Sequence, residues 1–203
     1  PFALFFAWLL ARRNFFGKTL VDGLIHLPLV LPPVVIGYIL LVMLGRKGLI
    51  GEWLYEALGV SVAFKWEGAA IASAVMGFPL MVRAIRLSLE TVDQGLEKAA
   101  RTLRAGPIRV FLTITLPLIS PGILTGVVLG FARSLGEFGA TITFVSNIPG
   151  ETRTLPLALY TFTQVPGGDA MAMRLTVIAV VLALLSLFIS EFLARRIRAR
   201  LGG

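Results

Sequence analysis

The sequence predicts an all-α, polytopic membrane protein, and three observations support this fold class. Of the 203 residues, 57% are hydrophobic and only 15% are charged, whereas soluble domains carry about 25% charged residues. The mean hydropathy is +0.87. Apolar stretches suited to crossing about 30 Å of hydrocarbon recur along the chain, and backbone in lipid must satisfy its own hydrogen bonds, as helices do.

We predict five transmembrane helices in one domain, 1–203. The first, over 2–11, spans about 15 Å as a helix, which is too short for the bilayer. We therefore expect a truncated span, and a sixth helix before Pro1 stays an open alternative. The second, over 24–44, contains Pro28, Pro32 and Pro33 and is expected to be a kinked helix, because neighbouring helices can satisfy the freed carbonyl groups.

The other three spans are expected over 68–89, 116–145 and 175–194, where the apolar runs are long enough to cross a bilayer. Between the second and third spans, residues 49–59 place apolar side chains on one helical face. We expect this segment to lie in the plane of the membrane interface.

The distribution of basic residues predicts the orientation of the chain. Thirteen of the 19 Lys and Arg residues fall within 12–18, 83–109 and 195–200, five fall on the opposite side, and Arg133 lies within a span. Segments rich in Lys and Arg stay in the cytoplasm. We therefore expect 90–117 and the C-terminus to be cytoplasmic, and five crossings would place the N-terminal end outside.

A polar stretch, 90–117, interrupts the apolar sequence and has the pattern of a short helix pair. Thr91 and Gln94 have capping-box spacing, and Gly106 followed by Pro107 is a helix stop signal. Two interpretations stay open for this stretch: a docking surface, or a basic linker on the membrane surface. The apolar face of its first helix is expected to comprise Val92, Leu96, Ala99, Ala100 and Leu103.

This stretch resembles the cytoplasmic signature of the permeases of importer-type ATP-binding-cassette (ABC) transporters, Glu-Ala-Ala, three residues, Gly, nine residues, Ile, one residue, Leu-Pro. Lys98 stands where Glu is usual, and Arg104 where Gly is usual. The resemblance implies that 90–115 is a cytoplasmic coupling loop that docks on an ATPase subunit. The implied coupling residues are Glu97, Lys98, Ala99, Ala100, Arg101, Arg104, Gly106, Ile114, Leu116 and Pro117.

The resemblance extends over the whole chain. Segments 26–35, 78–86, 131–156 and 166–168 are similar to the permeases of molybdate importers, and sulfate/thiosulfate and tungstate permeases are near relatives with the same architecture. It implies a type I importer fold in a bacterial or archaeal cytoplasmic (inner) membrane. The implied partners are a cytoplasmic ABC ATPase dimer, a periplasmic or extracellular molybdate-binding protein and membrane lipid, with no nucleic acid and no cofactor.

A five-span chain does not readily enclose a path alone, which favours a two-fold homodimer with a second copy. Arg133 and Glu137 are four residues apart and are expected to pair on one helical face, either to lock packing or to act as a gate. Hydroxyl and amide donors near the outer end of the fourth span suit an oxyanion. The candidate path residues are Arg133, Ser134, Glu137, Thr141, Thr143, Ser146 and Asn147.

Composition also bears on other function classes. The chain contains no Gly-rich loop ending in Gly-Lys-Ser/Thr, so we expect a transport subunit, not an enzyme, with ATP hydrolysed by a separate subunit. One His and no Cys argue against an intramembrane enzyme or a metal centre. An ion-coupled secondary transporter or channel is the remaining alternative, but Glu137 is the one carboxylate expected within a span. Asp22 and His26 have proton-relay spacing, and we favour a polar patch near the headgroups.

Overall fold

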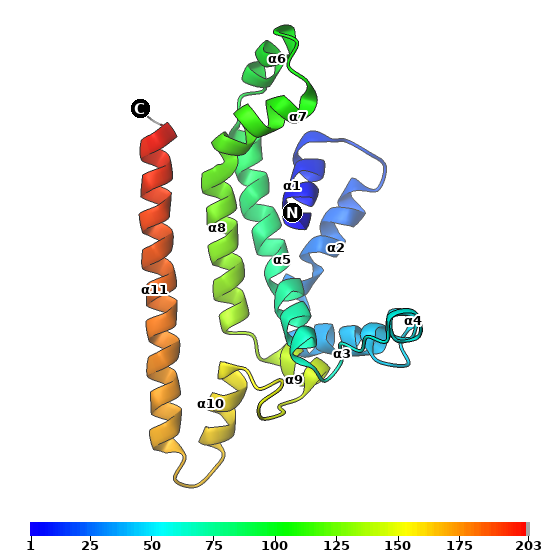
Figure 1. Ribbon diagram of the computed structural model, residues 1–203, viewed down its shortest axis with the longest axis vertical. Helices are drawn as coiled ribbons and strands as arrows, with labels where there is room; N and C mark the ends of the chain where they lie inside the picture. Colours follow the sequence, from blue (N-terminus) through cyan, green and yellow to red (C-terminus); the bar gives the residue numbers. More distant parts are fainter. Residues whose placement is uncertain (202–203) are drawn as a thin grey trace.

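The computed structural model describes the backbone of residues 1–201 and the side chains through Arg196. The side chains of Arg198 and Arg200, two of the predicted cytoplasmic cations, lie outside the described residues. Every regular element in the described chain is helical (Figure 1). The elements are α1 (Phe2–Arg12), α2 (Lys18–Val30), α3 (Pro33–Leu44), α4 (Leu49–Leu58), α5 (Trp66–Thr91), α6 (Gln94–Thr102), α7 (Pro107–Val110), the π-helical segment η1 (Phe111–Thr115), α8 (Leu116–Leu135), α9 (Gly139–Val145), α10 (Leu155–Thr163) and α11 (Asp169–Leu201).

The antiparallel helices α5 and α8 form the centre of the molecule, with α1 packed against α5 and α11 against α8 (Figure 1). Glycine residues of both α5 and α8 allow the two central helices to approach closely. A Cβ atom added to Gly77 would lie 3.1 Å from the carbonyl oxygen of Gly130, and one added to Gly126 would lie 3.2 Å from that of Met81. Small residues favour this kind of contact in membranes, where packing drives helix association.

Two apolar clusters lie along α5. One joins α1, α5 and α8 near the end that carries α6, and it includes Leu10, Leu89 and Ile119. The other joins α3, α5 and α9 at the opposite end, and it includes Met76 and Phe144. Both ends of α5 are therefore held by packed side chains.

The segment 24–44 differs from the single kinked helix expected from the sequence. It belongs to two helices, α2 and α3, which meet at an angle of 117°. Leu31 is extended (φ −73°, ψ 145°), because Pro32 disfavours the α conformation in the residue that precedes it. Pro33 then occupies the first turn of α3, where its missing N–H leaves no hydrogen bond unmade.

The segment 116–145 is also not one helix. The helical segment begins at Pro107, earlier than expected, and ends at Leu135; after Gly136 the chain turns into the short helix α9. Arg133 and Glu137 therefore lie at a junction between helices and not in the middle of a span.

Three described helical segments are long and apolar enough to cross a membrane: Trp66–Thr91, Pro107–Leu135 and Asp169–Arg196. The bent pair of α2 and α3 makes four if it counts as one span. Helix α1 is apolar but has 11 residues. The structure thus supports a multi-pass helical membrane protein, and the count of five spans stays a prediction.

Candidate functional site

Helix α6 lies at one end of the molecule, beyond the ends of α5 and α8 (Figure 1). Its N-cap is Asp93, whose Oδ1 accepts a hydrogen bond from the Gly95 N–H at 2.8 Å. The capping box expected from Thr91 and Gln94 is absent, because the Thr91 hydroxyl instead donates to the Ser88 carbonyl at 2.8 Å. The helix begins at Gln94 because Asp93 satisfies one of its first free N–H groups.

Helix α6 ends in a Schellman motif around Arg104. The Arg104 N–H donates to the Arg101 carbonyl at 3.0 Å, and the Ala105 N–H donates to the Ala100 carbonyl at 3.2 Å. This pair of bonds requires a left-handed residue after the C-cap, usually Gly, and Arg104 has φ +60°. The backbone thus keeps the turn at the position where importer permeases usually have Gly, although the residue is Arg.

The chain returns to α8 through α7 and η1. The Leu116 N–H donates to the Phe111 carbonyl, five residues back, which defines the wide turn of η1. Pro117 follows in the first turn of α8 and has no N–H with which to continue a regular ladder. Ile114 lies in η1 and Leu116 begins α8, so the Ile-x-Leu-Pro end of the signature lies where the chain enters the long helix α8.

The side of α6 that faces away from the bundle is apolar and uncovered. Leu96 is 48% exposed and Leu103 is 84% exposed, and Ala99 between them is also exposed. Val92, which the sequence pattern placed on this face, is instead 8% exposed and packs in the core near α1. The exposed part of the predicted docking face is therefore Leu96, Ala99 and Leu103, and these three residues are called the docking face of α6 below.

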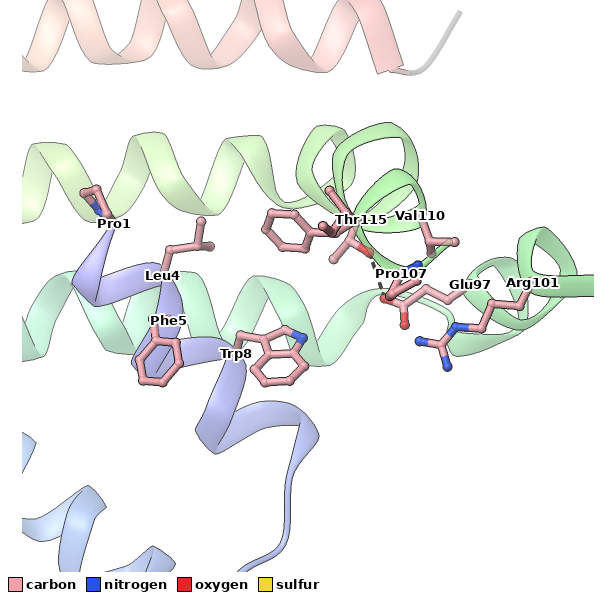
Figure 2. Close-up of a pocket in the computed structure, with 11 residues that line it drawn as sticks. Pro1, Leu4, Phe5, Trp8, Glu97, Arg101, Pro107, Val110 and Thr115 are labelled. Atoms are coloured by element: carbon pink, nitrogen blue, oxygen red, sulfur yellow. Dashed lines mark hydrogen bonds between the residues drawn. The ribbon is translucent and has the colours of Figure 1, made fainter. Parts of the chain in front are cut away.

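Glu97 points in the opposite direction, toward α1 and η1. Its Oε1 lies 3.2 Å from Nη2 of Arg12 and accepts a hydrogen bond from the Thr115 hydroxyl at 2.9 Å, the contact drawn in Figure 2. The Arg12 and Glu97 side chains are only 10% and 16% exposed. Glu97 thus ties α6 to the bundle, a role that the sequence did not indicate because Arg12 is 85 residues away.

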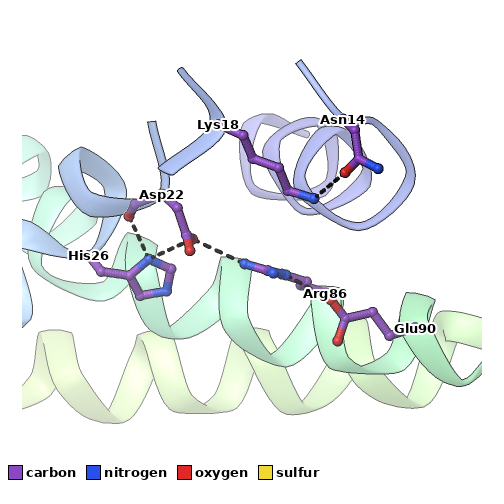
Figure 3. A network of polar contacts seen from close by, with 6 residues as sticks. All are labelled: Asn14, Lys18, Asp22, His26, Arg86 and Glu90. Carbon is purple, nitrogen blue, oxygen red and sulfur yellow. Dashed lines mark hydrogen bonds and ion pairs between the residues drawn. The ribbon is translucent and has the colours of Figure 1, made fainter. Parts of the chain in front are cut away.

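A second polar cluster joins α2 to α5 (Figure 3). Asp22 Oδ1 lies 3.1 Å from Nη1 of Arg86 and 3.3 Å from Nδ1 of His26, and Arg86 Nε donates to Glu90 at 2.9 Å. The sequence indicated Asp22 and His26 as one patch but missed both partners on α5. The cluster holds α2 against the central helix α5.

The predicted pair between Arg133 and Glu137 is present. Arg133 Nη1 lies 2.7 Å from Oε2 of Glu137, whose Oε1 accepts the Ala140 N–H at 2.8 Å. The Glu137 side chain is 1% exposed. Glu137 therefore pairs with Arg133 near the end of α8 and accepts a backbone hydrogen bond at the start of α9. Both contacts hold the two helices together, as expected for a charge that is buried in a membrane protein.

Most of the other candidate path residues make separate local hydrogen bonds. Asn147 donates to the Thr161 hydroxyl at 2.8 Å and accepts from Arg153 at 2.9 Å. The Thr143 hydroxyl bonds its own helix at Gly139. The remaining positions are Ser134, which donates to the Ser73 carbonyl at 3.3 Å, and Ser146, which has φ +65° and accepts from Thr152.

Thr141 differs from the other hydroxyls because it is fully buried and its Oγ1 has no hydrogen-bond partner. It follows Glu137 by one helical turn. The unpartnered hydroxyl of Thr141 therefore lies at the same junction as the Arg133–Glu137 ion pair. In the part of the chain that the structure describes, no group of three His, Cys, Asp or Glu side chains is placed to hold a metal ion.

Comparison with known proteins identifies the family to which this chain belongs. Residues 2–199 match the family described as "Binding-protein-dependent transport system inner membrane component". The molybdenum transport system permease protein ModB of Escherichia coli (strain K12) is 66% identical over 202 residues, covering 100% of this chain and 88% of the relative. ModB of Haemophilus influenzae is 63% identical over the same shares.

The fold is also found in solved structures. A bacterial ABC transporter involved in alginate import has a TM-score of 0.73 at 16% identity, covering 97% of this chain and 72% of the transporter chain. The MetNI methionine ABC transporter in an inward-facing form has a TM-score of 0.66 at 15% identity, covering 97% and 89%. The chain therefore belongs to the inner membrane components of binding-protein-dependent transport systems.

Proposed function

We propose that this chain is the membrane-spanning permease subunit of an ATP-driven importer that moves molybdate into the cell by alternating access. The substrate assignment rests on the sequence identity of 66% and 63% to two molybdenum permeases across the whole chain. Sulfate permeases are also similar, but at 38% identity for that of Escherichia coli. Molybdate is therefore favoured over sulfate.

Energy for transport comes from a separate cytoplasmic ATPase dimer that docks on α6. The uncovered face of Leu96, Ala99 and Leu103 supplies an apolar contact, and the small side chain of Ala99 lets a partner backbone come close. A periplasmic or extracellular molybdate-binding protein delivers the ion at the opposite end, and a second copy of the chain completes the path. A ligand-loaded binding protein and the ATPase each favour one of two conformations, which is what alternating access requires.

Movement of α6 reaches the membrane helices by two routes in this arrangement. One is covalent, through η1 into α8, and π-helical turns inside helices are frequent at functional sites. The other is the contact of Glu97 with Arg12 and Thr115. A displacement of α6 is thereby passed to α1 and α8 together.

The junction of Arg133, Glu137 and Thr141 is the part of the predicted path that we retain as a gate. Glu137→Gln keeps an acceptor for the Ala140 N–H but removes the charge that pairs with Arg133. Loss of one partner of a fully buried ion pair lowers the stability of a protein by about 3–5 kcal/mol. The loss is smaller here because the Arg133 side chain is 27% exposed. We expect an assembled complex with uptake lowered several-fold; wild-type thermal stability together with wild-type uptake would contradict both the packing role and the gate.

The experiment that tests the function is uptake into proteoliposomes that contain the permease and its ATPase. We expect molybdate accumulation that requires ATP inside and loaded binding protein outside, with tungstate and sulfate as competing ions. Uptake that continues without the ATPase would indicate a secondary transporter. Accumulation of sulfate in preference to molybdate would overturn the substrate assignment while leaving the transporter class intact.

A further inference from the structure

Two cavities lie side by side between α1 and the loop formed by α6, α7 and η1. They share Trp8, Glu97 and Arg101. The smaller cavity, of about 250 Å³, is mostly polar; the larger, of about 460 Å³, is mostly apolar. Neither cavity is lined by Leu96, Ala99 or Leu103, the exposed apolar face of α6.

The smaller cavity has an excess of positive charge. Its charged lining consists of one carboxylate, Glu97, and the four cations Arg12, Arg13, Lys98 and Arg101. Glu97 is already engaged by Arg12 and Thr115. Cations held this close repel one another, so an anion from outside the chain would be attracted to this cavity.

Arg12 carries an unused donor in the same place. Its side chain is only 10% exposed, yet its Nε is buried and has no hydrogen-bond partner. A buried donor without an acceptor is unfavourable, more so when the group is charged. Because the Nε atom itself is buried, a phosphate oxygen in the cavity reaches it only after the Arg12 side chain shifts. The charge-assisted bond that then forms is of a strong kind.

The larger cavity has the character of a site for an acyl chain. Its apolar lining includes Leu4 and Phe5 on α1 and Ile108 and Phe111 on the loop. Figure 2 shows Leu4, Phe5 and Trp8 along α1, with Glu97 and Arg101 beyond Trp8. The ring of Trp8 thus stands at the boundary between the two cavities, and the Arg13 guanidinium lies 5.6 Å from its centroid. Trp at such a boundary is typical of the membrane interface.

We propose that the two cavities form one binding site for an anionic phospholipid. The headgroup phosphate binds the exposed cations Arg13 and Lys98 and reaches Arg12 Nε after a shift of that side chain, and an acyl chain occupies the apolar cavity beside Trp8. Basic pockets between membrane helices bind anionic headgroups in this way. A free oxyanion would match the polar cavity but would leave the apolar one without an occupant. The lipid joins α1 to α6 beside the Glu97 contact, so membrane composition affects how firmly α6 is held.

The test uses Trp8 as the reporter. With Trp53→Phe and Trp66→Phe, Trp8 is the single tryptophan of the chain. The full-length permease is placed in phosphatidylcholine nanodiscs, and phosphatidylglycerol or phosphatidylcholine with brominated acyl chains is titrated in. We expect phosphatidylglycerol to quench Trp8 at mole fractions where phosphatidylcholine does not. Equal quenching by the two lipids overturns the proposal.

Two variants separate the parts of the site. Arg13→Gln with Lys98→Gln removes two exposed cations and leaves the Arg12 contact intact; we expect the phosphatidylglycerol needed for half-quenching to rise roughly tenfold. Ile108→Asn keeps the charge and places an amide in the apolar cavity; we expect quenching by phosphatidylglycerol to weaken several-fold. If Trp8 in either variant is quenched by phosphatidylglycerol as in the wild type, with unchanged helix content, the proposed lipid site is wrong.

The matched control is Lys47→Gln with Lys65→Gln, the same change in charge at exposed positions at the opposite end of the molecule. It should quench as the wild type does. Excess inorganic phosphate should not relieve quenching, because phosphate lacks the acyl chain. Relief by phosphate would show that the polar cavity takes a free oxyanion, and loss of quenching in the control would show a general effect of charge; each outcome overturns the proposal.

Discussion

Arg104 occupies a backbone conformation that suits Gly better than Arg. A side chain at φ +60° crowds the following carbonyl group, which costs about 1–2 kcal/mol for an L-residue. The Schellman motif at the end of α6 nevertheless forms, because its two hydrogen bonds and the stop at Gly106 and Pro107 leave the chain little alternative. The left-handed turn is therefore formed although Arg disfavours this backbone conformation.

This strain predicts the effect of Arg104→Gly. We expect α6 to gain about 1 kcal/mol of local stability, which corresponds to roughly fivefold slower hydrogen exchange at the Ala105 amide. Arg104→Ala is the control, since it removes the charge but keeps the Cβ atom that causes the strain. Equal slowing of exchange in both variants would assign the effect to charge and not to backbone conformation.

Helix α6 has few tertiary contacts, and the main ones are with α7, η1 and Arg12. Such an element moves as a small lever unless something ties it to the bundle. The Glu97 carboxylate supplies the tie from the middle of the helix, where a force on the docking face of α6 would act. An ion pair that is mostly buried holds its geometry better than an exposed one, which solvent screens.

We expect Glu97→Gln to uncouple ATP hydrolysis from transport. The amide is close in shape and can still accept a hydrogen bond, but it forms no ion pair with Arg12. The ATPase rate should therefore persist while the molybdate transported per ATP falls several-fold. Arg12→Gln should give the same fall, and the double variant should be no worse than either single change, as a double-mutant cycle requires for a shared contact. An unchanged ratio of transport to hydrolysis in both single variants would show that the Glu97–Arg12 contact has no role in coupling.

The sequence predicted the long apolar helices well and the breaks between helices poorly. The span expected over 68–89 lies within α5, and the span over 175–194 lies within α11. The signals for the breaks were present at Pro32, Pro33 and Gly136, but an apolar run reports burial in lipid and not the direction of the backbone. Hydropathy therefore joined α2 to α3 and α8 to α9.

The candidate site was predictable in part, for a similar reason. The Arg133–Glu137 pair follows from local spacing and is confirmed. The Glu97–Arg12 contact joins positions 85 residues apart, and no periodicity within one segment reports a partner on another. The inward direction of Glu97 likewise depends on how α1 packs against α5, which is a property of the folded molecule.

The whole molecule has two distinct ends. Helix α6, the Arg12 end of α1 and the C-terminal part of α11 lie at one end, whereas α4 and the loop before α10 lie at the other (Figure 1). The first end carries the basic segments around α6, the uncovered apolar docking face and both cavities. The sides are apolar, and the hydrophobic part of α11 is almost uncovered by the rest of the chain. Lipid and a second copy are the surroundings that such a surface suits.

The orientation of these ends can be measured directly because the chain has no native cysteine. Ala99→Cys places a thiol on the docking face of α6, and Glu56→Cys places one on the exposed side of α4 at the opposite end. The excess of basic residues near α6 predicts that end to be cytoplasmic. A membrane-impermeant maleimide should therefore label Glu56→Cys in intact spheroplasts, and Ala99→Cys only in inverted vesicles. Adding the ATPase to the inverted vesicles should protect Ala99→Cys, because the docking face is then covered. Labelling from the reverse sides would overturn the orientation, whereas correct labelling without protection would keep the orientation and place the ATPase elsewhere.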